Sequence, residues 1–251
     1  MIVNPVFRMS TVRALGVVVV AMGIIVIVKG RATGAAGDPP CSPLGAECVT
    51  PPPVLVVDGT PAPLAASEFC RNVGYLCAGL NDLDLIRLLR WKDFDGTIVV
   101  HVPLPDFEEP TAARDLQIAA AQGIRAWNRQ PFPILVDLRG DRNPHFSVSW
   151  TRSLGGDQLG VARTQWSQAT GLRVLSVDLT TRNPLAPGRP ADTRQIRLTA
   201  AHEMGHALGL PHSTSPRDVM YPSNTATSMS AQDYRSVEVL YQTRDGTVVT
   251  R

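Results

Sequence analysis

From about residue 94 onward, hydrophobic and polar positions repeat with the periods of regular secondary structure. Short β-branched and apolar runs predict five strands, and apolar residues spaced three and four apart predict three helices. The resulting order is strand, helix, four strands, helix, irregular loop and helix. The predicted strands lie at 96–105, 132–140, 145–152, 159–164 and 172–180, and the predicted helices at 111–128, 192–209 and 230–242.

Two of the predicted helices begin with capping signals. Asp192 is followed three positions later by Gln195, and Ser230 is followed three positions later by Asp233. In this spacing the first side chain accepts hydrogen bonds from free amides of the first helical turn, and the second reaches back to the cap. We therefore expect Asp192 and Ser230 to be the N-caps of these helices.

The chain before residue 94 has a less regular pattern. Residues 32–63 are rich in Gly, Ala and Pro, which is the composition of a linker. Further on, Asn81 can cap a short helix. The apolar residues of that helix would be Leu85, Ile86, Leu88 and Leu89.

The N-terminus contains fifteen uncharged, mostly apolar residues, 14–28, after two arginines. A basic start, a short apolar run and small residues beyond it are typical of a secretory signal. The run is shorter than the roughly 20 residues that span a bilayer. Lys29 and Arg31 balance the charge on its far side, which weakens the case for cleavage. A cleaved signal and an N-terminal membrane anchor therefore both stay open for residues 1–36.

The four cysteines form two pairs, each with six residues between its members. An even number in an exported chain indicates two disulfides, which we expect to be local. Four cysteines allow three pairings, so the spacing does not fix the connectivity. The candidates are Cys41, Cys48, Cys70 and Cys77.

The composition is that of a globular protein, with 44% hydrophobic and 18% charged residues. The formal net charge is only +2, and the charges are spread evenly along the chain. No basic segment therefore argues for a nucleic-acid partner.

Three of the five histidines fall within eleven residues, at His202, His206 and His212. The first two are four apart on a predicted helix, so their imidazoles share one face and can reach one metal ion. Gly209 can end the helix with a positive φ, and Pro211 keeps it from resuming. His212 can then swing back as a third ligand, which leaves a fourth zinc position open for water, as in catalytic sites.

A glycine inside this helix, Gly205, costs about 1 kcal/mol relative to alanine. Local rules of this kind are usually broken at functional or closely packed sites. We therefore expect another part of the chain to pass close to the helix backbone at Gly205.

The segment HEMGHALGLPH fits the metzincin pattern H-E-x-x-H-x-x-G-x-x-H. The following SPRDVMYP resembles the Met-turn of that clan, and the Ser after the third histidine, the LGL before it and the Tyr-Pro after the methionine resemble matrixins, the matrix metalloproteinase group. The resemblance covers about residues 95–245 in element order, and its specific part is 202–222. It implies an α+β, zincin-like metzincin fold with a twisted, mixed five-stranded sheet and three helices.

The resemblance also implies roles for individual residues. His202, His206 and His212 would bind one zinc ion, Glu203 would be the general base and proton donor, and Met220 would form the floor beneath the metal. Asp233 resembles the buried aspartate that braces the Met-turn. The substrate would lie along an edge strand that contains Leu159, Gly160, Val161 and Ala162. One wall of the pocket beside it would be formed by Tyr221, Pro222 and Ser223.

The sequence departs from the matrixin pattern in two ways. No segment resembles the propeptide motif whose cysteine caps the zinc, so latency through residues 32–90 would need another device. Only His101 and His145 remain outside the motif, too few for the three-histidine structural zinc site of the vertebrate enzymes. We expect these two histidines to be structural or exposed.

Calcium binding stays open as a possibility, although the aspartates show no EF-hand spacing.

The sequence thus predicts a zinc-dependent metalloendopeptidase that acts on proteins or peptides as a monomer. Residues 1–36 would be the signal or anchor, 37–93 a linker or pro-segment, and 94–246 the catalytic domain. The protein would be secreted, extracellular or periplasmic, with membrane contact only through residues 14–28. One alternative is a zinc-binding, non-proteolytic peptide-binding or adhesion module, against which the intact Glu203 argues. Another is a protease that processes only its own chain or one dedicated partner.

Overall fold

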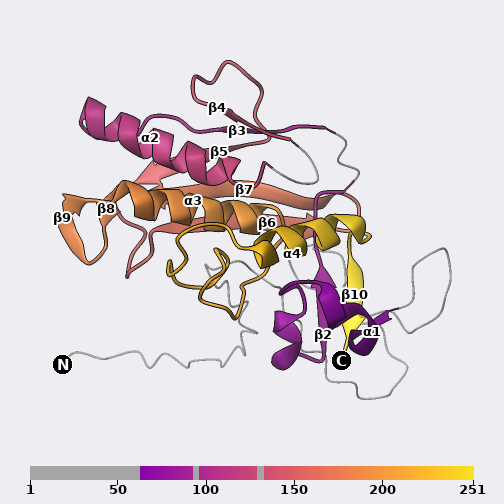
Figure 1. Cartoon of the computed structure of the whole chain (residues 1–251). Coiled ribbons are helices and arrows are strands. Elements are labelled where there is room, and N and C mark those ends of the chain that lie inside the picture. The colour runs from indigo at the N-terminus through magenta and orange to yellow at the C-terminus, as the bar shows by residue number, and fades with distance from the viewer. Residues whose placement is uncertain (1–62, 93–95, 129–132) are drawn as a thin grey trace, which may run out of the picture.

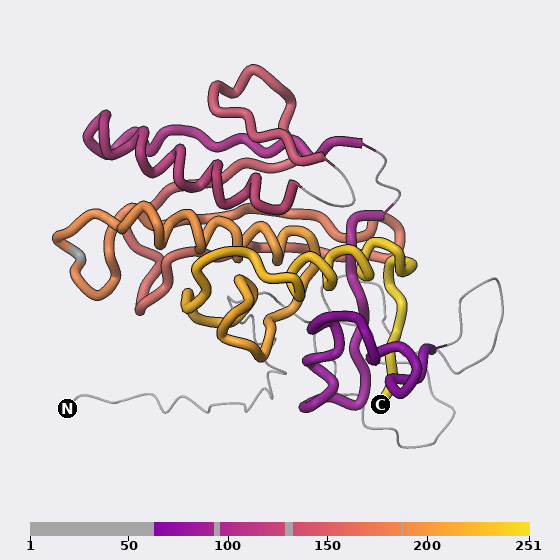
Figure 2. The backbone as a smooth tube through the Cα atoms, in the orientation of Figure 1, coloured from indigo at the N-terminus to yellow at the C-terminus, as the bar shows by residue number. Residues whose placement is uncertain are grey.

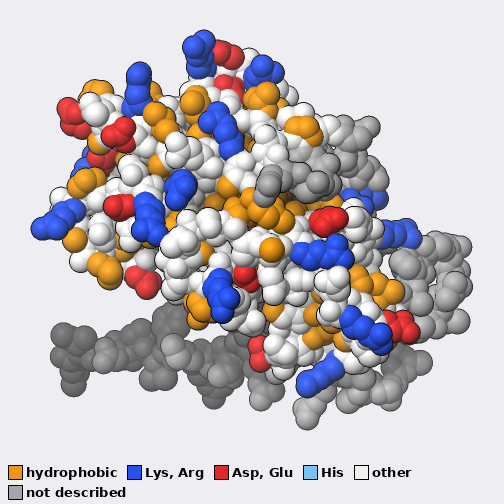
Figure 3. All heavy atoms as spheres, viewed as in Figure 1, with side chains coloured by type: hydrophobic (Ala, Val, Ile, Leu, Met, Phe, Trp, Pro, Cys, Tyr) orange, Lys and Arg blue, Asp and Glu red, His pale blue; other side chains and the backbone are white. Residues whose placement is uncertain are grey.

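A computed structural model describes residues 63–92, 96–128 and 133–251 of the chain. Predictions that fall on residues 1–62, including the apolar run 14–28 and the pair Cys41 and Cys48, lie outside the described residues. No helix among the described residues is long and apolar enough to cross a bilayer. Lys and Arg side chains are interspersed with Asp and Glu on the face shown in Figure 3.

One layer of the fold is a mixed five-stranded sheet with the order β4-β3-β5-β7-β6 (Figure 1). Neighbouring strands are parallel except for the last pair, in which β6 runs antiparallel to β7 and lies at the sheet edge. The five predicted strands are confirmed, as is the α+β fold class. Their bounds are β3 Ile98–His101, β4 Ile134–Asp137, β5 Phe146–Thr151, β6 Gly160–Ser167 and β7 Gly171–Thr180.

The three predicted helices are also present, as α2 (Pro110–Arg125), α3 (Thr193–Ala207) and α4 (Ala231–Gln242). The Asp192 side chain accepts from the amides of Arg194 and Gln195, as expected of an N-cap. Ser230 and Asp233 form a complete capping box at the start of α4. Both capping predictions are therefore confirmed.

Helices α2 and α3 lie side by side against the sheet (Figures 1 and 2). Their close approach depends on Gly123, because a Cβ there would lie 2.1 Å from the Arg197 carbonyl oxygen. Near the end of α2, the buried Trp127 donates from its indole nitrogen to the Ala201 carbonyl at 2.7 Å. This contact fixes α3, which carries two of the three clustered histidines, relative to α2.

A second, three-stranded sheet has the order β1-β10-β2. It joins β1 (Leu64–Ala65) and β2 (Leu85–Leu88) to β10 (Thr247–Thr250), so segments from the two ends of the described chain lie together (Figures 1 and 2). Residues 64–92 therefore share a sheet with the C-terminus, and their buried side chains belong to the same hydrophobic core as the rest of the fold.

The predicted helix over 85–89 is wrong, because residues 85–88 form the strand β2. Its burial alternates, with Leu85 44% exposed and Ile86 and Leu88 4% exposed each, which is the period of a strand. The partner that satisfies its backbone is β10, about 160 residues away, and no local pattern reveals such a pairing. Asn81 ends a 3₁₀ turn, Ala78–Asn81, instead of capping a helix.

Short turns of helix precede β2 and carry a disulfide. The helix α1 (Ala66–Phe69) is followed by the 3₁₀ turn Cys70–Asn72, and Cys70 is bonded to Cys77. This local pairing is one of those that the sequence allowed.

A hairpin that the sequence analysis did not predict precedes α3. It pairs β8 (Arg182–Asn183) with β9 (Ala186–Pro190). The Asn183 side chain accepts from the Leu185 amide at 2.9 Å and stabilises the turn. Leu185 at the tip is 87% exposed.

The burial difference along β2 gives a test of this sheet. Leu88→Ala should lower the free energy of unfolding by about 2–4 kcal/mol, because a buried leucine leaves a cavity when truncated. Leu85→Ala, three residues away on the opposite, exposed face of the strand, should change it by no more than about 0.5 kcal/mol. Chemical denaturation of both variants measures the difference. Equal changes in the free energy of unfolding for the two variants would contradict the alternating burial of β2. Equally small changes would indicate that residues 85–88 do not pack against the rest of the fold.

Candidate metal centre and cleft

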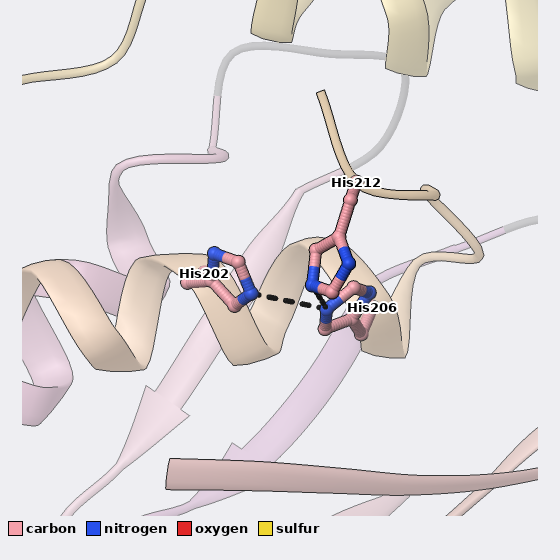
Figure 4. Close-up of side chains that lie close together, drawn as sticks. All are labelled: His202, His206 and His212. Carbon is pink, nitrogen blue, oxygen red and sulfur yellow. Dashed lines mark hydrogen bonds between the residues drawn. The ribbon is translucent and has the colours of Figure 1, made fainter. Parts of the chain in front are cut away.

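The three clustered histidines converge on one point (Figure 4). His202 and His206 project from neighbouring turns of α3, and His212 reaches them from the loop that follows. The Nε2 atom of His206 lies 3.1 Å from that of His202 and 3.2 Å from that of His212. Of the described residues, no other group of three His, Cys, Asp or Glu side chains converges in this way.

Two main-chain carbonyls fix the tautomers of the first two rings. The Nδ1 atom of His202 lies 2.8 Å from the Val219 oxygen, and that of His206 lies 2.9 Å from the Leu210 oxygen. A carbonyl can only accept, so each Nδ1 carries the proton and each Nε2 presents a lone pair.

The three imidazoles are held neutral by their surroundings. Burial lowers the pKa of His202 to about 4, and burial also lowers the pKa of His206 and His212. Neutral rings place unprotonated Nε2 atoms of His202 and His206 face to face, an arrangement that is repulsive without a shared cation. The donor set therefore fits a zinc ion with three nitrogen ligands and an open position.

The turn after α3 has the geometry that brings His212 back. The Gly209 amide donates to the His206 carbonyl at 2.9 Å, and the Leu210 amide donates to the Gly205 carbonyl at 3.0 Å. These are the two bonds of a Schellman motif, and Gly209 has the positive φ of +96° that the motif requires. The predicted helix stop is confirmed, and the same turn aims the Leu210 carbonyl at His206.

Met220 lies directly beneath the helix that carries the histidines. It is fully buried, and a Cβ on Gly205 would lie 2.2 Å from its sulfur. The close approach that the helix glycine predicted is therefore confirmed, and the part of the chain that approaches is Met220. The Met220 carbonyl accepts from the Ser213 amide at 2.8 Å, which ties this turn to the histidine loop.

Asp233 anchors the turn from below. Its side chain is fully buried and accepts from the amide of Val219 at 3.0 Å and from that of Ser230 at 2.8 Å. The contact with Val219 agrees with the bracing role that the resemblance implied. A further donor, the Tyr75 hydroxyl, lies 3.0 Å from the other carboxylate oxygen. Tyr75 was missed, because it is 158 positions away in sequence and its surroundings show no local signal.

Glu203 lies between α3 and the edge strand β6. Burial raises the pKa of Glu203 to about 8, and the Ala162 amide, which donates to the carboxylate, opposes that rise. A cation at the histidines would favour the carboxylate further. The approach requires Gly160, because a Cβ there would lie 2.9 Å from Glu203 Cγ and 2.5 Å from Thr199 Cγ2.

The histidines and Glu203 open into a cavity of about 270 Å³ between the edge strand and the 222–224 loop. Leu159, Gly160, Val161, Pro222 and Ser223, which the resemblance proposed as substrate contacts, line it. Ala162 instead contacts Glu203, and Tyr221 is not part of the lining. None of the described residues 63–92 lines the cavity.

Several cavity residues were missed by the sequence analysis. Gln195 and Thr199 lie on the face of α3 that carries His202 and His206, and Asn224 donates to the Thr199 hydroxyl at 2.6 Å. The hairpin tip adds Asn183 to Leu185. The spacing 195, 199, 202 and 206 is a helical stripe and could have indicated the first two residues.

His101 and His145 lie away from this centre. His101 Nδ1 is 3.1 Å from the Asp137 carbonyl, and His145 Nδ1 accepts from the Val99 amide at 3.0 Å. The Asp137 carboxylate accepts from three amides of the loop that follows, Arg139, Gly140 and Arg142. These contacts are structural, as expected of the two histidines.

Comparisons with known proteins match the C-terminal part of the chain. Residues 131–242 match the model of the Matrixin family. Over 50 residues, the chain is 46% identical to a macrophage metalloelastase of Rattus norvegicus, which covers 18% of this chain and 10% of that protein. Over 58 residues, it is 46% identical to matrix metalloproteinase-9 of Canis lupus familiaris, covering 22% of this chain and 8% of that protein. These matches confirm the resemblance to matrixins.

Gly205→Ala tests the packing beneath the metal centre. Alanine should stabilise a helix by about 1 kcal/mol, but here its Cβ overlaps Met220. We expect a net loss of about 1–3 kcal/mol, as for other overpacked sites. Gly188→Ala is the matched control, since a Cβ there meets nothing within 4 Å. Denaturation measures both, and a stabilised Gly205→Ala would refute the close contact.

Proposed function

We propose that this chain, which carries a matrixin-type catalytic domain and hence the fold of a zinc metalloendopeptidase, cleaves internal peptide bonds with Glu203 as general base. The observation that carries the proposal is the convergence of three neutral imidazole nitrogens beside a buried carboxylate in one cavity. This donor set supports zinc binding by the histidines. The catalytic and substrate-binding roles of individual residues are proposed in addition.

When bound, zinc supplies acidification of a water molecule and polarisation of the substrate carbonyl. The Glu203 carboxylate accepts the proton from the attacking water and then delivers it to the leaving amine. The Ala162 amide keeps the carboxylate in place for both transfers. The main-chain bonds from His202 and His206 keep their Nε2 atoms unprotonated throughout.

The edge of β6 is the proposed docking site for an extended peptide. The Leu159 carbonyl is used by the Thr180 amide on the sheet side. Because backbone groups alternate along an antiparallel strand, Gly160 and Ala162 direct theirs to the open side, where Ala162 already holds Glu203. A peptide that adds to this edge would pair with Gly160 and place its scissile bond beside Glu203.

The cavity beyond Glu203 favours a polar substrate side chain. Thr199, Asn224 and Gln195 line its wall along α3. The Thr199 hydroxyl accepts from Asn224 and can donate its own proton to a substrate group. We propose that an uncharged polar side chain enters here, between Pro222 and Ser223 on one side and β6 on the other.

The disulfide between Cys70 and Cys77 supports an oxidising compartment, because such bonds rarely persist in the cytosol. We propose a secreted, extracellular or periplasmic protein on this ground. Several features stay predictions from the sequence: a signal or anchor at 1–36, a monomeric state and calcium binding. Whether the substrates are many or one dedicated partner also stays open.

The alternative function, a zinc-binding module without activity, is less well supported. Zinc binding alone does not require a carboxylate beside the histidines, and Gly160 leaves room for Glu203 in particular.

Glu203→Gln should remove the base and keep the metal site. We expect kcat/KM on a quenched-fluorescent peptide library to fall by about 10²–10⁴-fold, the usual contribution of a general base. Zinc content, measured by atomic absorption, should stay stoichiometric. Removal of zinc with a chelator should abolish cleavage in the parent, and re-addition should restore it.

Glu238→Gln is the matched control for this charge change, since Glu238 is half-buried, lies outside the cavity lining and pairs with Arg235 on α4. It should leave cleavage and zinc content unchanged. Stoichiometric zinc with no cleavage by the parent would sink the endopeptidase and favour the binding module.

Thr199→Val tests the polar cavity. Valine keeps the shape and removes the hydroxyl, so the preference for glutamine over leucine at the substrate position that enters the cavity should fall by about 10-fold or more. Competition between the two peptides measures the ratio. Thr193→Val, on the exposed start of the same helix, should leave the ratio unchanged. A parent that prefers leucine would refute the polar cavity while leaving the endopeptidase intact.

A further inference from the structure

We propose that Tyr75 is a positioning residue of the metal centre, which it reaches through Asp233 and the Val219 main chain. The inference rests on the proposed zinc site and deepens it. Tyr75 itself lies outside the segment 131–242 that matches the Matrixin family. It assigns a role in the centre to the segment that precedes the predicted catalytic domain.

Tyr75 is held in the interior by hydrogen bonds from both its side chain and its main chain. Its side chain is 5% exposed, and its hydroxyl donates to Asp233 Oδ1 at 3.0 Å. Its amide donates to Ser236 Oγ at 3.0 Å. The chain can come this close to α4 because Gly74 precedes it, with φ of +63° and a position where a Cβ would lie 2.1 Å from Ser236 Oγ.

The loop that carries Tyr75 is itself held in place. The disulfide between Cys70 and Cys77 closes it, and Val73 and Leu76 are buried in the core on either side of Tyr75. The phenol is therefore presented to Asp233 by a closed and anchored loop.

Both oxygens of Asp233 accept hydrogen bonds. Oδ1 accepts from the Tyr75 hydroxyl at 3.0 Å and, at a longer 3.5 Å, from the Met220 amide, while Oδ2 accepts from the Val219 and Ser230 amides. A fully buried carboxylate needs partners on both oxygens, because an unsatisfied one would carry the full cost of its desolvation. Tyr75 makes the shorter of the two bonds to Oδ1 and thereby helps to set the rotation of the carboxylate that holds Val219.

Val219 passes this constraint to the metal ligand. Its amide is bound by Asp233, and its carbonyl accepts from His202 Nδ1 at 2.8 Å. The path from the phenol to the imidazole is therefore a continuous series of hydrogen bonds: Tyr75 to Asp233, Asp233 to Val219, Val219 to His202. Partners of this kind orient metal-ligating histidines, and their loss weakens metal binding.

The surroundings of Tyr75 keep its hydroxyl protonated. Burial and the charge of Asp233 raise the pKa of Tyr75 well above its usual value. The hydroxyl therefore stays protonated, and remains a donor to Asp233, at neutral pH. Because residues 63–92 contribute nothing to the cavity lining, the segment acts on the centre from beneath and not from the cleft.

Tyr75→Phe tests the proposal in the full chain, with Tyr234→Phe as the matched control. The Tyr234 hydroxyl also donates within the fold, to the Ala126 carbonyl at the end of α2 at 3.1 Å, whereas that of Tyr75 donates to the carboxylate that holds Val219. Both variants remove only a phenol hydroxyl. Zinc affinity is measured by competition with a fluorescent chelator, and stability by denaturation of the metal-free protein.

Tyr75→Phe should raise the zinc Kd by about tenfold, the lower end of the effect of outer partners on metal affinity. Tyr234→Phe should lower stability to a similar degree and leave the Kd unchanged. An unchanged Kd in Tyr75→Phe, or an equal rise in both variants, would overturn the proposal and leave Tyr75 a purely structural residue.

A second variant decides the question if Tyr75→Phe does not fold. Changing Cys70→Ser and Cys77→Ser together keeps the phenol and loosens the loop that presents it, so the Kd should rise by a smaller factor in the same direction. An unchanged Kd there would count against the proposal. A parent that binds no zinc would instead refute the proposed function, and a parent that binds zinc without cleaving would still allow the comparison of Kd values.

Discussion

Two hydrogen bonds from imidazole to main-chain carbonyl set the arrangement of the histidine cluster. They hold protons on the Nδ1 atoms of His202 and His206 and leave the Nε2 lone pairs facing each other at 3.1 Å. The arrangement is favourable only with a shared cation, so the fold must keep both carbonyls in place against that repulsion. The turn through Gly209 supplies one carbonyl, and the turn held by Asp233 supplies the other.

Three glycines on or against α2 and α3 make this arrangement compact. Gly123 lets α2 approach α3, Gly160 lets Glu203 lie against the edge strand, and Gly205 lets Met220 pass beneath the histidines. In each case a Cβ would come within 3 Å of an atom of the neighbouring element. Close packing of this kind transmits displacement, because interiors have few voids to absorb it. The histidines of α3, Glu203 and the edge strand β6 are thereby packed closely against one another.

The parts that the sequence predicted well are those whose signals are local. The period of the apolar residues, the caps at Asp192 and Ser230, the helix stop at Gly209 and the close approach at Gly205 each depend on a few neighbouring positions. The strand β2 was mistaken for a helix because its partner β10 lies at the other end of the chain. The link from Tyr75 to Asp233 was missed for the same reason, since both residues look ordinary in their own neighbourhoods.

These long-range contacts also bear on where the functional unit begins. Besides β2 and Tyr75, the indole of Trp91 donates to the Ala207 carbonyl at 2.8 Å, and a Cβ on Gly209 would lie 2.0 Å from the Leu89 carbonyl oxygen. The segment 64–92 thus contacts the end of α3, the histidine turn and the support of Val219, while it leaves the cavity open. A pro-segment that is removed on activation would be expected to cover the cleft and to make few contacts in the core. Residues 64–92 do the opposite, which favours a permanent structural part of the metal centre over a removable inhibitor.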